Sequence, residues 1–316
     1  MKKILIAGAA GQIGSELTER LRNQYGNENV IAAIHSNSNK NTSVAKPVCN
    51  LDIRDQNSLQ GIVKQYEIDS IFHLASLLSA KAEQNPQLAW EVNVNGLMNV
   101  LEVARQYNCG IFFPSSIGAF GPGTPRDNTP QITIQRPNTI YGISKQSGEL
   151  LCDYYYNRYA VDTRGLRYPG IISYQALPGG GTTDYAVHMF YAALQTKQYE
   201  CYLKPKTRLD MMYMPDALDA AINLMQAESK KLQHRNAYNV TAMSFTPQEL
   251  ADEIKKHIPE FEVNYQIDPT RQAIADSWPN HMDDSAARQE WGWQPSYILS
   301  SMVEDMLQQL AKKLNN

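Results

Sequence analysis

The amino-acid sequence predicts an α/β fold in which a doubly wound parallel sheet carries a smaller α+β lobe on its C-terminal side. In the first half of the chain, short apolar runs alternate with longer segments of helical periodicity. Strands separated by helices of this length pair in parallel, and their crossover connections are right-handed. After Tyr168 the alternation becomes irregular, which predicts a different architecture for the remainder. A chain of 316 residues is long enough for two domains, or for one large domain with an appendage.

The elements of the predicted sheet follow from the spacing of apolar residues. Residues 12–25 show helical periodicity because Ile13, Leu17 and Leu21 recur on one face. Pro86 is favourable in a first helical turn and opens a helix that continues to residue 107. The expected strands are residues 3–7, 30–34, 43–48, 70–74, 110–114 and 162–168, and the expected helices are residues 12–25, 57–66, 86–107 and 139–159.

The second half contains helices with recognisable start signals. Thr246 and Glu249 form a capping box that begins a helix ending near residue 257. Asp216 is expected to cap its own helix, residues 216–227. Further expected helices are residues 183–196 and the amphipathic tail 300–314. We therefore predict two units: residues 1–170, with residues 210–240 packing back on them, and residues 171–316, which form the smaller lobe.

Charge and composition exclude several classes of function. The net charge is −3 and no run of Lys or Arg exceeds two residues, so we expect binding neither to nucleic acid nor to an acidic membrane surface. No stretch approaches the ~20 apolar residues of a membrane span, and the apolar run at the start is too short for a signal peptide. The four cysteines and six histidines are scattered without metal-ligand spacing. We therefore expect a cytoplasmic protein without a bound metal.

A glycine-rich turn lies between the first strand and the first helix. Gly8, Gly11 and Gly14 are spaced as in dinucleotide-binding turns, with Gln12 and Ile13 between them. Gly8 permits the tight turn, Gly11 lets the backbone approach a pyrophosphate, and Gly14 lets the helix pack on the sheet. The helix N-terminus then offers free N–H groups to phosphate. The alternative is a tight strand–helix turn that binds nothing.

The acidic residue that usually binds the adenosine ribose is missing at the end of the second strand. Ile34 and His35 stand there, and no arginine is present for a 2′-phosphate. NAD is therefore expected rather than NADP, but NADP stays open. Asp52, followed by Ile53, is a candidate for the adenine edge; its alternative is an aspartate that only shapes a turn.

Tyr141 and Lys145 are spaced i, i+4 and share one face of a predicted helix. A phenol has a pKa near ~10 and is a poor base at neutral pH, but a neighbouring ammonium favours the phenolate. Tyr141 is therefore a candidate base for a substrate hydroxyl. Ser115 and Ser116 end a parallel strand, where ligands of open α/β sheets bind. Ser116 is our first choice for hydrogen bonding the substrate oxygen and Ser115 the second; the alternative is that both only cap a loop.

These motifs together resemble the extended short-chain dehydrogenase/reductase family over essentially the whole chain. The motifs are Gly8-x-x-Gly11-x-x-Gly14, Asp52-Ile53, His73-Leu74-Ala75-Ser76, Asn93-Val94-Asn95-Gly96, Ser115-Ser116 and Tyr141-x-x-x-Lys145. The resemblance implies a Rossmann domain in residues 1–170. It implies cofactor contacts from the glycine turn, Asp52, Ile53, Leu74, Ala75, Tyr141 and Lys145, with Tyr168 beside the nicotinamide.

Within that family the chain resembles the short-chain L-threonine 3-dehydrogenases. The matching stretches are residues 77–80 with 85–86, 178–186, 211–216 and 277–279. The resemblance implies NAD-linked oxidation of the 3-hydroxyl of L-threonine to 2-amino-3-oxobutanoate, without a metal, in a homodimer joined through helices. The chain departs from these relatives at Ile34 and His35, where they carry an aspartate.

An amino-acid substrate needs partners for its charged ends. The candidates for its carboxylate are Ser79, the backbone amides of Gly180 and Gly181, and the hydroxyls of Thr182 and Thr183. Trp278 is a candidate for closing the pocket against water. The alternatives are a flexible surface loop at the glycines and a core position for Trp278.

Two other functions are compatible with the same motifs. A nucleotide-sugar epimerase or dehydratase would use the same tyrosine, lysine and serine, with Arg208 and Arg271 available for a diphosphate. A regulatory protein that senses a dinucleotide would need the glycine turn but not the catalytic residues.

Overall fold

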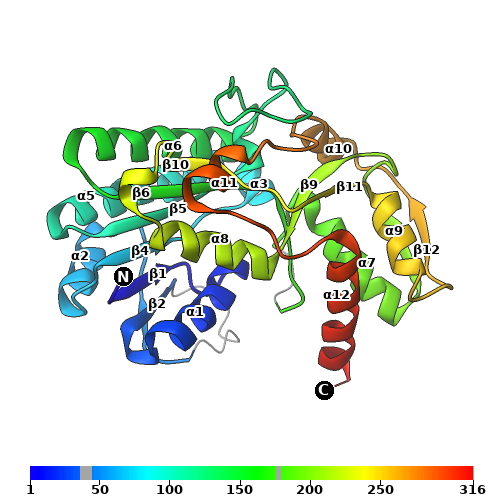
Figure 1. Cartoon of the computed structure of the whole chain (residues 1–316), viewed down its shortest axis with the longest axis horizontal. Coiled ribbons are helices and arrows are strands. Elements are labelled where there is room, and N and C mark those ends of the chain that lie inside the picture. The colour runs from blue at the N-terminus through cyan, green and yellow to red at the C-terminus, as the bar shows by residue number, and fades with distance from the viewer. Residues whose placement is uncertain (36–44, 176–178, 316) are drawn as a thin grey trace.

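The larger part of the molecule is a seven-stranded parallel sheet with the order β10-β6-β5-β4-β1-β2-β3. The computed structural model describes residues 1–35, 45–175 and 179–315. Figure 1 shows the strands of this sheet running across one half of the molecule among the helices. The strands are β1 (Ile4–Ala7), β2 (Val30–Ile34), β3 (Val48–Asn50), β4 (Ser70–His73), β5 (Gly110–Ser116), β6 (Thr163–Tyr168) and β10 (Asn236–Asn239).

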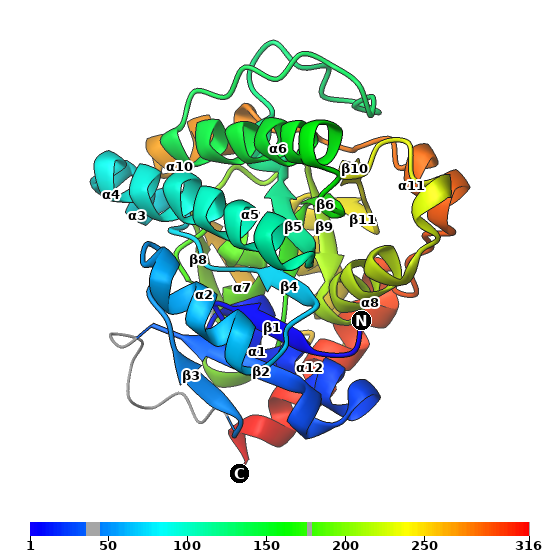
Figure 2. The ribbon, with the colours of Figure 1, turned by 90° about the vertical axis from the view of Figure 1, so that its left-hand side faces the viewer.

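Helices cover both faces of this sheet. One face carries α2 (Gln56–Gln65), α5 (Gly96–Tyr107) and α6 (Ile140–Tyr159), which pack side by side (Figure 2). The other face carries α1 (Gln12–Tyr25) and α8 (Met214–Gln226).

Strands β1 and β2 are apolar on both sides, as strands buried between two layers of helices require. Successive side chains of a strand point to opposite faces, so each strand contributes to two cores. Ile4 and Ile6 belong to the core beneath α1 and α8, whereas Leu5 and Ala7 belong to the core beneath α2, α5 and α6. All four are fully or almost fully buried.

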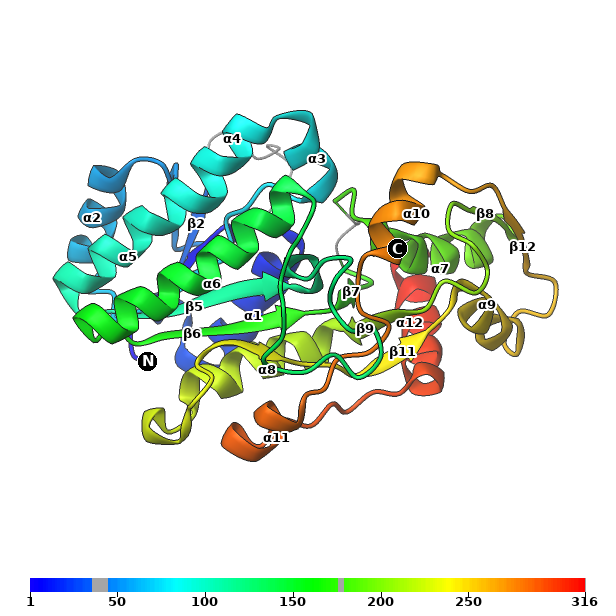
Figure 3. The same ribbon diagram turned by 90° about the horizontal axis from the view of Figure 1, so that it is seen from above.

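The smaller lobe has its own core and lies beyond the carboxyl ends of the sheet strands (Figure 3). One of its sheets has three strands in the order β11-β9-β7, and the other pairs β12 with β8. The strands are β7 (Gly170–Ile172), β8 (Gln198–Cys201), β9 (Leu209–Tyr213), β11 (Met243–Phe245) and β12 (Glu262–Tyr265). The helices are α7 (Tyr185–Gln195), α9 (Pro247–Lys255), α10 (Pro269–Asp276) and α12 (Leu299–Leu314).

The two parts are interleaved along the chain. Strand β9 of the smaller lobe runs directly into α8, which packs on the large sheet, and β10 then adds to the edge of that sheet. Helix α11 (Ser285–Trp291) also packs against β10 before the chain returns to the small lobe. This arrangement confirms the predicted doubly wound parallel sheet with a C-terminal lobe.

Several predicted elements differ in detail. The third strand is Val48–Asn50 rather than 43–48, of which residues 43 and 44 lie outside the described residues. The helix predicted over 86–107 is α4 (Pro86–Trp90), a π-helical turn (Glu91–Asn95) and α5 in succession. The short helix α3 (Ser79–Gln84) was not predicted.

The prediction that Asp216 caps its own helix is wrong. Helix α8 begins two residues earlier, at Met214, and has no side-chain cap. The Asp216 carboxylate instead accepts hydrogen bonds from the backbone amides of Ser296 and Tyr297, at 2.8 and 3.1 Å. The capping box of Thr246 and Glu249 is confirmed, since each side chain accepts from the other residue's amide. Its helix ends at Lys255.

No helix of the described residues is long and apolar enough to span a membrane.

Candidate functional site

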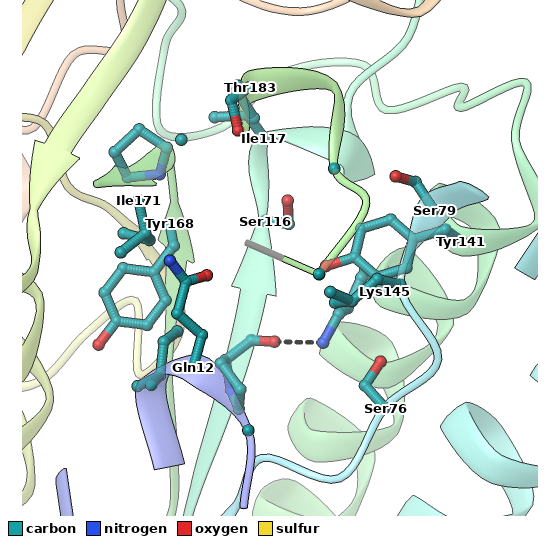
Figure 4. A pocket seen from close by; sticks show the side chains of 18 of the residues that line it. Gln12, Ser76, Ser79, Ser116, Ile117, Tyr141, Lys145, Tyr168, Ile171 and Thr183 are labelled. Atoms are coloured by element: carbon teal, nitrogen blue, oxygen red, sulfur yellow. Dashed lines mark hydrogen bonds between the residues drawn. The ribbon is translucent and has the colours of Figure 1, made fainter. Parts of the chain in front are cut away.

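The main candidate site is a pocket between the sheet and the smaller lobe, with a cavity of about 240 Å³. Its walls come from the carboxyl ends of β1, β4, β5 and β6 and from the loop before α7, which is where ligands of doubly wound sheets bind. Figure 4 shows side chains from both walls converging on it. The lining includes Gly8, Gly11, Gln12, Ile13, Gly14, Leu74, Ser79, Ser115, Ser116, Tyr141, Lys145, Tyr168, Gly179, Gly181, Thr182, Thr183, Asp184 and Trp278.

The glycine turn has the close backbone packing that its spacing predicts. Gly8 has a φ of +93°, and a Cβ there would lie 2.7 Å from the amide nitrogen of Ala75. A Cβ on Gly14 would lie 2.2 Å from the carbonyl oxygen of Gly8. Gly11 is the N-cap of α1 and offers no side chain to the first amides of the helix. The helix therefore presents its N-terminus to the pocket without a side chain in the way.

Gln12 gives an independent sign that this side of the pocket takes a polar ligand. Its amide nitrogen is buried and has no hydrogen-bond partner among the described residues. Figure 4 shows its side chain in the pocket between Tyr168 and Ser116. A buried polar group is normally satisfied, so an unpaired amide in a pocket marks a place for a ligand atom. The residues of this wall therefore fit a dinucleotide.

The other predicted cofactor residues divide into two groups. Leu74 and Tyr168 line the pocket, and the Tyr168 hydroxyl donates to the carbonyl of Ala217 at 2.6 Å, which fixes the ring. Ala75 and Ile53 are not among the lining residues; Ile53 is buried, with its side chain close to Gly96.

Asp52 lies in a separate surface hollow beside the end of β2. Arg54 donates to both of its oxygens, at 2.6 to 3.2 Å, and this pairing holds the pKa of Asp52 well below its usual range. The nearer ring nitrogen of His35, Nε2, is 3.5 Å from the same carboxylate. The expected acidic residue is missing at positions 34 and 35, but the carboxylate of Asp52 lies beside His35.

Tyr141 and Lys145 face the same cavity from α6, which begins at the Thr139 cap. The Lys145 Nζ lies 5.5 Å from the centre of the Tyr141 ring and donates to the Pro114 carbonyl at 2.7 Å. Burial raises the pKa of Tyr141 to about 12, and a hydrogen bond with Ser116 partly opposes this shift. Burial lowers the pKa of Lys145 to about 8, and the charge of Glu149 opposes that shift.

The two candidate serines have different partners. The Ser115 hydroxyl donates to the buried carboxylate of Glu149. Ser116 Oγ accepts from the Gly118 amide at 3.1 Å, and its own proton faces the pocket side, where it can be donated to the Tyr141 oxygen or to a ligand oxygen. Of the two, Ser116 therefore has the geometry for hydrogen bonding a ligand oxygen.

The substrate-side candidates are brought together except for Gly180. Ser79, Thr182, Thr183 and Trp278 line the pocket, whereas Gly180 does not. The predicted nest of glycine amides is already filled, because the amides of Gly180 and Gly181 both donate to the Asp184 carboxylate, at 2.8 and 2.6 Å. Trp278 is 7% exposed, so it is both a core residue and part of the pocket wall.

Asn93 holds the backbone beside the pocket. It lies in the π-helical turn, a feature common near functional sites. Its side chain bonds the amide and the carbonyl of Leu77, at 2.8 and 3.1 Å, and the hydroxyl of Ser144 at 3.1 Å. It therefore ties the loop before Ser79 to α6.

Two buried titratable residues near the site were not predicted. His73 ends β4 in full burial, which together with the charge of Lys145 lowers its pKa to about 3 and keeps it neutral. Glu149 lies one helical turn after Lys145, so the i, i+4 spacing that identified Lys145 would have found it too. Among the described residues, no group of three His, Cys, Asp or Glu side chains is arranged to hold a metal.

Comparisons with known proteins agree with this geometry. Residues 4–241 match the model of the NAD dependent epimerase/dehydratase family. An uncharacterized epimerase/dehydratase of Staphylococcus haemolyticus is 50% identical over the full length of both chains. Solved L-threonine dehydrogenases of Clostridium difficile and of Cupriavidus necator, the latter GalE-like and in its holo form, are 55% and 48% identical, with TM-scores of 0.95 and 0.94. They cover 99% and 98% of this chain, which covers 98% and 99% of theirs. The chain belongs to the NAD dependent epimerase/dehydratase family, the extended short-chain dehydrogenases/reductases.

Proposed function

We propose that the protein catalyses the NAD-dependent oxidation of the 3-hydroxyl of L-threonine to 2-amino-3-oxobutanoate. The observation that carries the proposal is the grouping of Tyr141, Lys145 and Ser116 in one pocket that a glycine turn also lines. The likeness to solved L-threonine dehydrogenases over nearly the whole chain supports this reaction over others of the family.

Tyr141 is the proposed base. Without a cofactor its pKa is about 12, so it is a protonated phenol at neutral pH. The Lys145 ammonium and the positive nicotinamide of the oxidised cofactor favour the phenolate. The phenolate oxygen then takes the proton of the substrate hydroxyl while Ser116 hydrogen-bonds the same oxygen. The bound cofactor supplies a hydride acceptor at this place.

The amino-acid substrate would lie against the lobe-side wall. Ser79, Thr182 and Thr183 offer hydroxyls to its carboxylate, and the Asp184 carboxylate is near enough to the pocket to attract its ammonium. Since Gly180 and Gly181 already serve Asp184, the hydroxyls and not the glycine amides are the proposed carboxylate partners. Trp278 would exclude water from the reacting atoms.

The proposed cofactor is NAD. The family and the holo neighbour imply a nicotinamide dinucleotide. The Asp52 carboxylate beside His35 disfavours the extra phosphate of NADP by like-charge repulsion. Arg54 pairs with Asp52 at 2.6 Å and offsets part of this repulsion, so the ratio of NAD to NADP affinities is the quantity to measure.

We further propose a cytoplasmic homodimer with residues 1–170 as the dinucleotide-binding domain, 210–240 packed back on it, and 171–316 as the substrate lobe. Helix α6 exposes an apolar stripe outward, with Leu150 62% and Tyr154 53% exposed. These two residues are one turn apart and share a face, which suits packing against the same helix of a second copy. Sedimentation of the wild type and of Leu150→Glu tests this, since the charge should dissociate the dimer.

The function is tested by mixing the protein with NAD and either L-threonine or a panel of nucleotide sugars. NADH absorbance that rises with threonine alone supports the proposal. Interconversion of a nucleotide sugar without net NADH would establish the epimerase alternative, and NAD binding without any turnover would establish a sensor.

A further inference from the structure

The Glu149 carboxylate is buried beneath the candidate site and is bonded from several sides. It is 4% exposed and lies on α6 one turn beyond Lys145. Arg167 of β6 donates to its two oxygens from Nε and Nη2, at 3.0 and 2.8 Å. Gln135 donates from the preceding loop at 3.0 Å, and Ser115 donates from β5. Two strands, one helix and one loop therefore meet at one carboxylate.

Glu149 and Lys145 both hydrogen-bond the end of β5. Lys145 binds the carbonyl of Pro114 at 2.7 Å (Figure 4), and Glu149 binds the hydroxyl of the next residue, Ser115. The residue after that is Ser116, which faces Tyr141 in the pocket. Two contacts one helical turn apart therefore set how α6 lies against the strand that carries Ser116.

Glu149 is also the negative charge that supports the Lys145 ammonium. The titratable groups facing Lys145 are Tyr141 on the same helix, His73 from β4, and Glu149. Tyr141 and His73 are neutral at pH 7 without a cofactor. Glu149 in turn faces Arg167, and it acts on Asp153 one turn further along α6. Electrostatic attraction is strong in the protein interior, so removing the charge of Glu149 should lower the pKa of Lys145 further.

We propose that Glu149 is a positioning residue for the reaction: through Ser115 it fixes the strand end that carries Ser116, and through its charge it supports the Lys145 ammonium. The inference rests on the proposed function for its catalytic readout. Nothing in it requires Glu149 to touch substrate or cofactor.

Three variants separate the two roles. Glu149→Gln keeps the shape and removes the charge, Ser115→Ala removes the strand contact and keeps the charge, and Glu149→Asp keeps the charge on a shorter arm. Asp284→Asn is the matched control, because Asp284 is also a buried carboxylate, bonded by Arg288 at 2.7 and 2.9 Å and by Trp293 at 3.0 Å, and it does not line the pocket.

The readouts are kcat against pH with L-threonine, and NADH binding against pH followed by nicotinamide fluorescence. For Glu149→Gln we expect kcat to fall roughly 10- to 100-fold and the alkaline limb of both profiles to move to lower pH by about one unit. Glu149→Asp should restore part of that shift. Ser115→Ala should lower kcat severalfold with unmoved profiles, and Asp284→Asn should lose stability with unmoved profiles.

Normalised profiles of Glu149→Gln that superimpose on the wild type would overturn the role of the charge. If Glu149→Gln does not fold, Ser115→Ala decides the strand role, and full activity of that variant would overturn it. The binding profile needs no substrate. A wild type that binds NADH but leaves threonine unoxidised would therefore reject the proposed function while the role of Glu149 is still measured.

Discussion

The glycine turn on the cofactor side of the pocket is one continuous stretch of chain, Gly8 to Gly14, whereas the substrate side joins residues as distant as Ser79 and Trp278. In this turn the important atoms are backbone, and Gly8 and Gly14 lie where a side chain would collide with neighbouring backbone. On the substrate side the important atoms are hydroxyls and a carboxylate placed by loops. At Gly8 and Gly14 even one added carbon atom collides with the backbone. On the substrate side, single side chains can be replaced without moving the backbone.

Tyr141→Phe should give the largest effect on turnover, because Tyr141 is the proposed base for the substrate hydroxyl and lies where the cofactor and substrate sides meet. Loss of the proposed base should lower kcat by roughly 10²- to 10⁴-fold. The affinity for NADH should be nearly unchanged, since the ring that fills the site is kept. Stopped-flow turnover and fluorescence titration measure the two quantities, and full activity in this variant would rule out Tyr141 as the base.

Gly14→Ala should break the cofactor side. Its Cβ would lie 2.2 Å from the Gly8 carbonyl, so the strand–helix turn must move. We expect a loss of about 1–3 kcal/mol in the free energy of unfolding, as for an overpacked core, and a clear loss of NADH affinity. Gly61→Ala is the control, because a Cβ there meets nothing within 4 Å and alanine favours the helix α2. Equal behaviour of both variants in urea titrations would contradict this account of the turn.

Ser79→Ala should affect the substrate side alone. Losing one hydroxyl partner of a charged group corresponds to about 1.5–3 kcal/mol, so KM for threonine should rise roughly 10-fold or more. NADH affinity should stay at the wild-type value, because Ser79 is proposed to touch only the substrate. A variant in which NADH affinity falls and KM does not would assign Ser79 to the cofactor side.

Glu16→Gln probes the junction between the two sides and should give the smallest effect. Glu16 of α1 accepts a hydrogen bond from Ser173, at the start of the segment that leads to the substrate loop. Burial raises its pKa from 4.5 to about 7, so the folded protein prefers the protonated acid. The contribution of protonated Glu16 to the free energy of unfolding is complete below pH 4.5 and is lost as the pH rises to about 7. Denaturant curves at fixed pH should show this fall, about 1 kcal/mol or more, in the wild type and not in Glu16→Gln.

The contrast between the two sides also explains which features were predictable from the sequence. Residues 12–25 and 30–34 form the expected helix and strand, because periodicity and a glycine turn are local signals. Tyr141 and Lys145 were predicted as a pair from their spacing on one helix, and both line the pocket in the structure.

The features that sequence reasoning missed depend on contacts distant in the chain or on loop geometry. Asp216 serves amides 80 and 81 residues away, which no local rule reveals. The amides of Gly180 and Gly181 were expected to be free, but the loop folds back so that Asp184 takes both. Glu149 was within reach of the spacing argument, yet its importance comes from Arg167 and Ser115 on neighbouring strands.

The passage of β9 straight into α8 has a mechanical consequence. The polypeptide passes from one part to the other between Tyr168 and Gly170, between Tyr213 and Met214, between Asn239 and Met243, and again before and after α11. A body joined at several points does not swing freely on a single linker. Any opening that admits substrate must be a small rotation that all these junctions share, and neither part is a suitable fragment for separate expression.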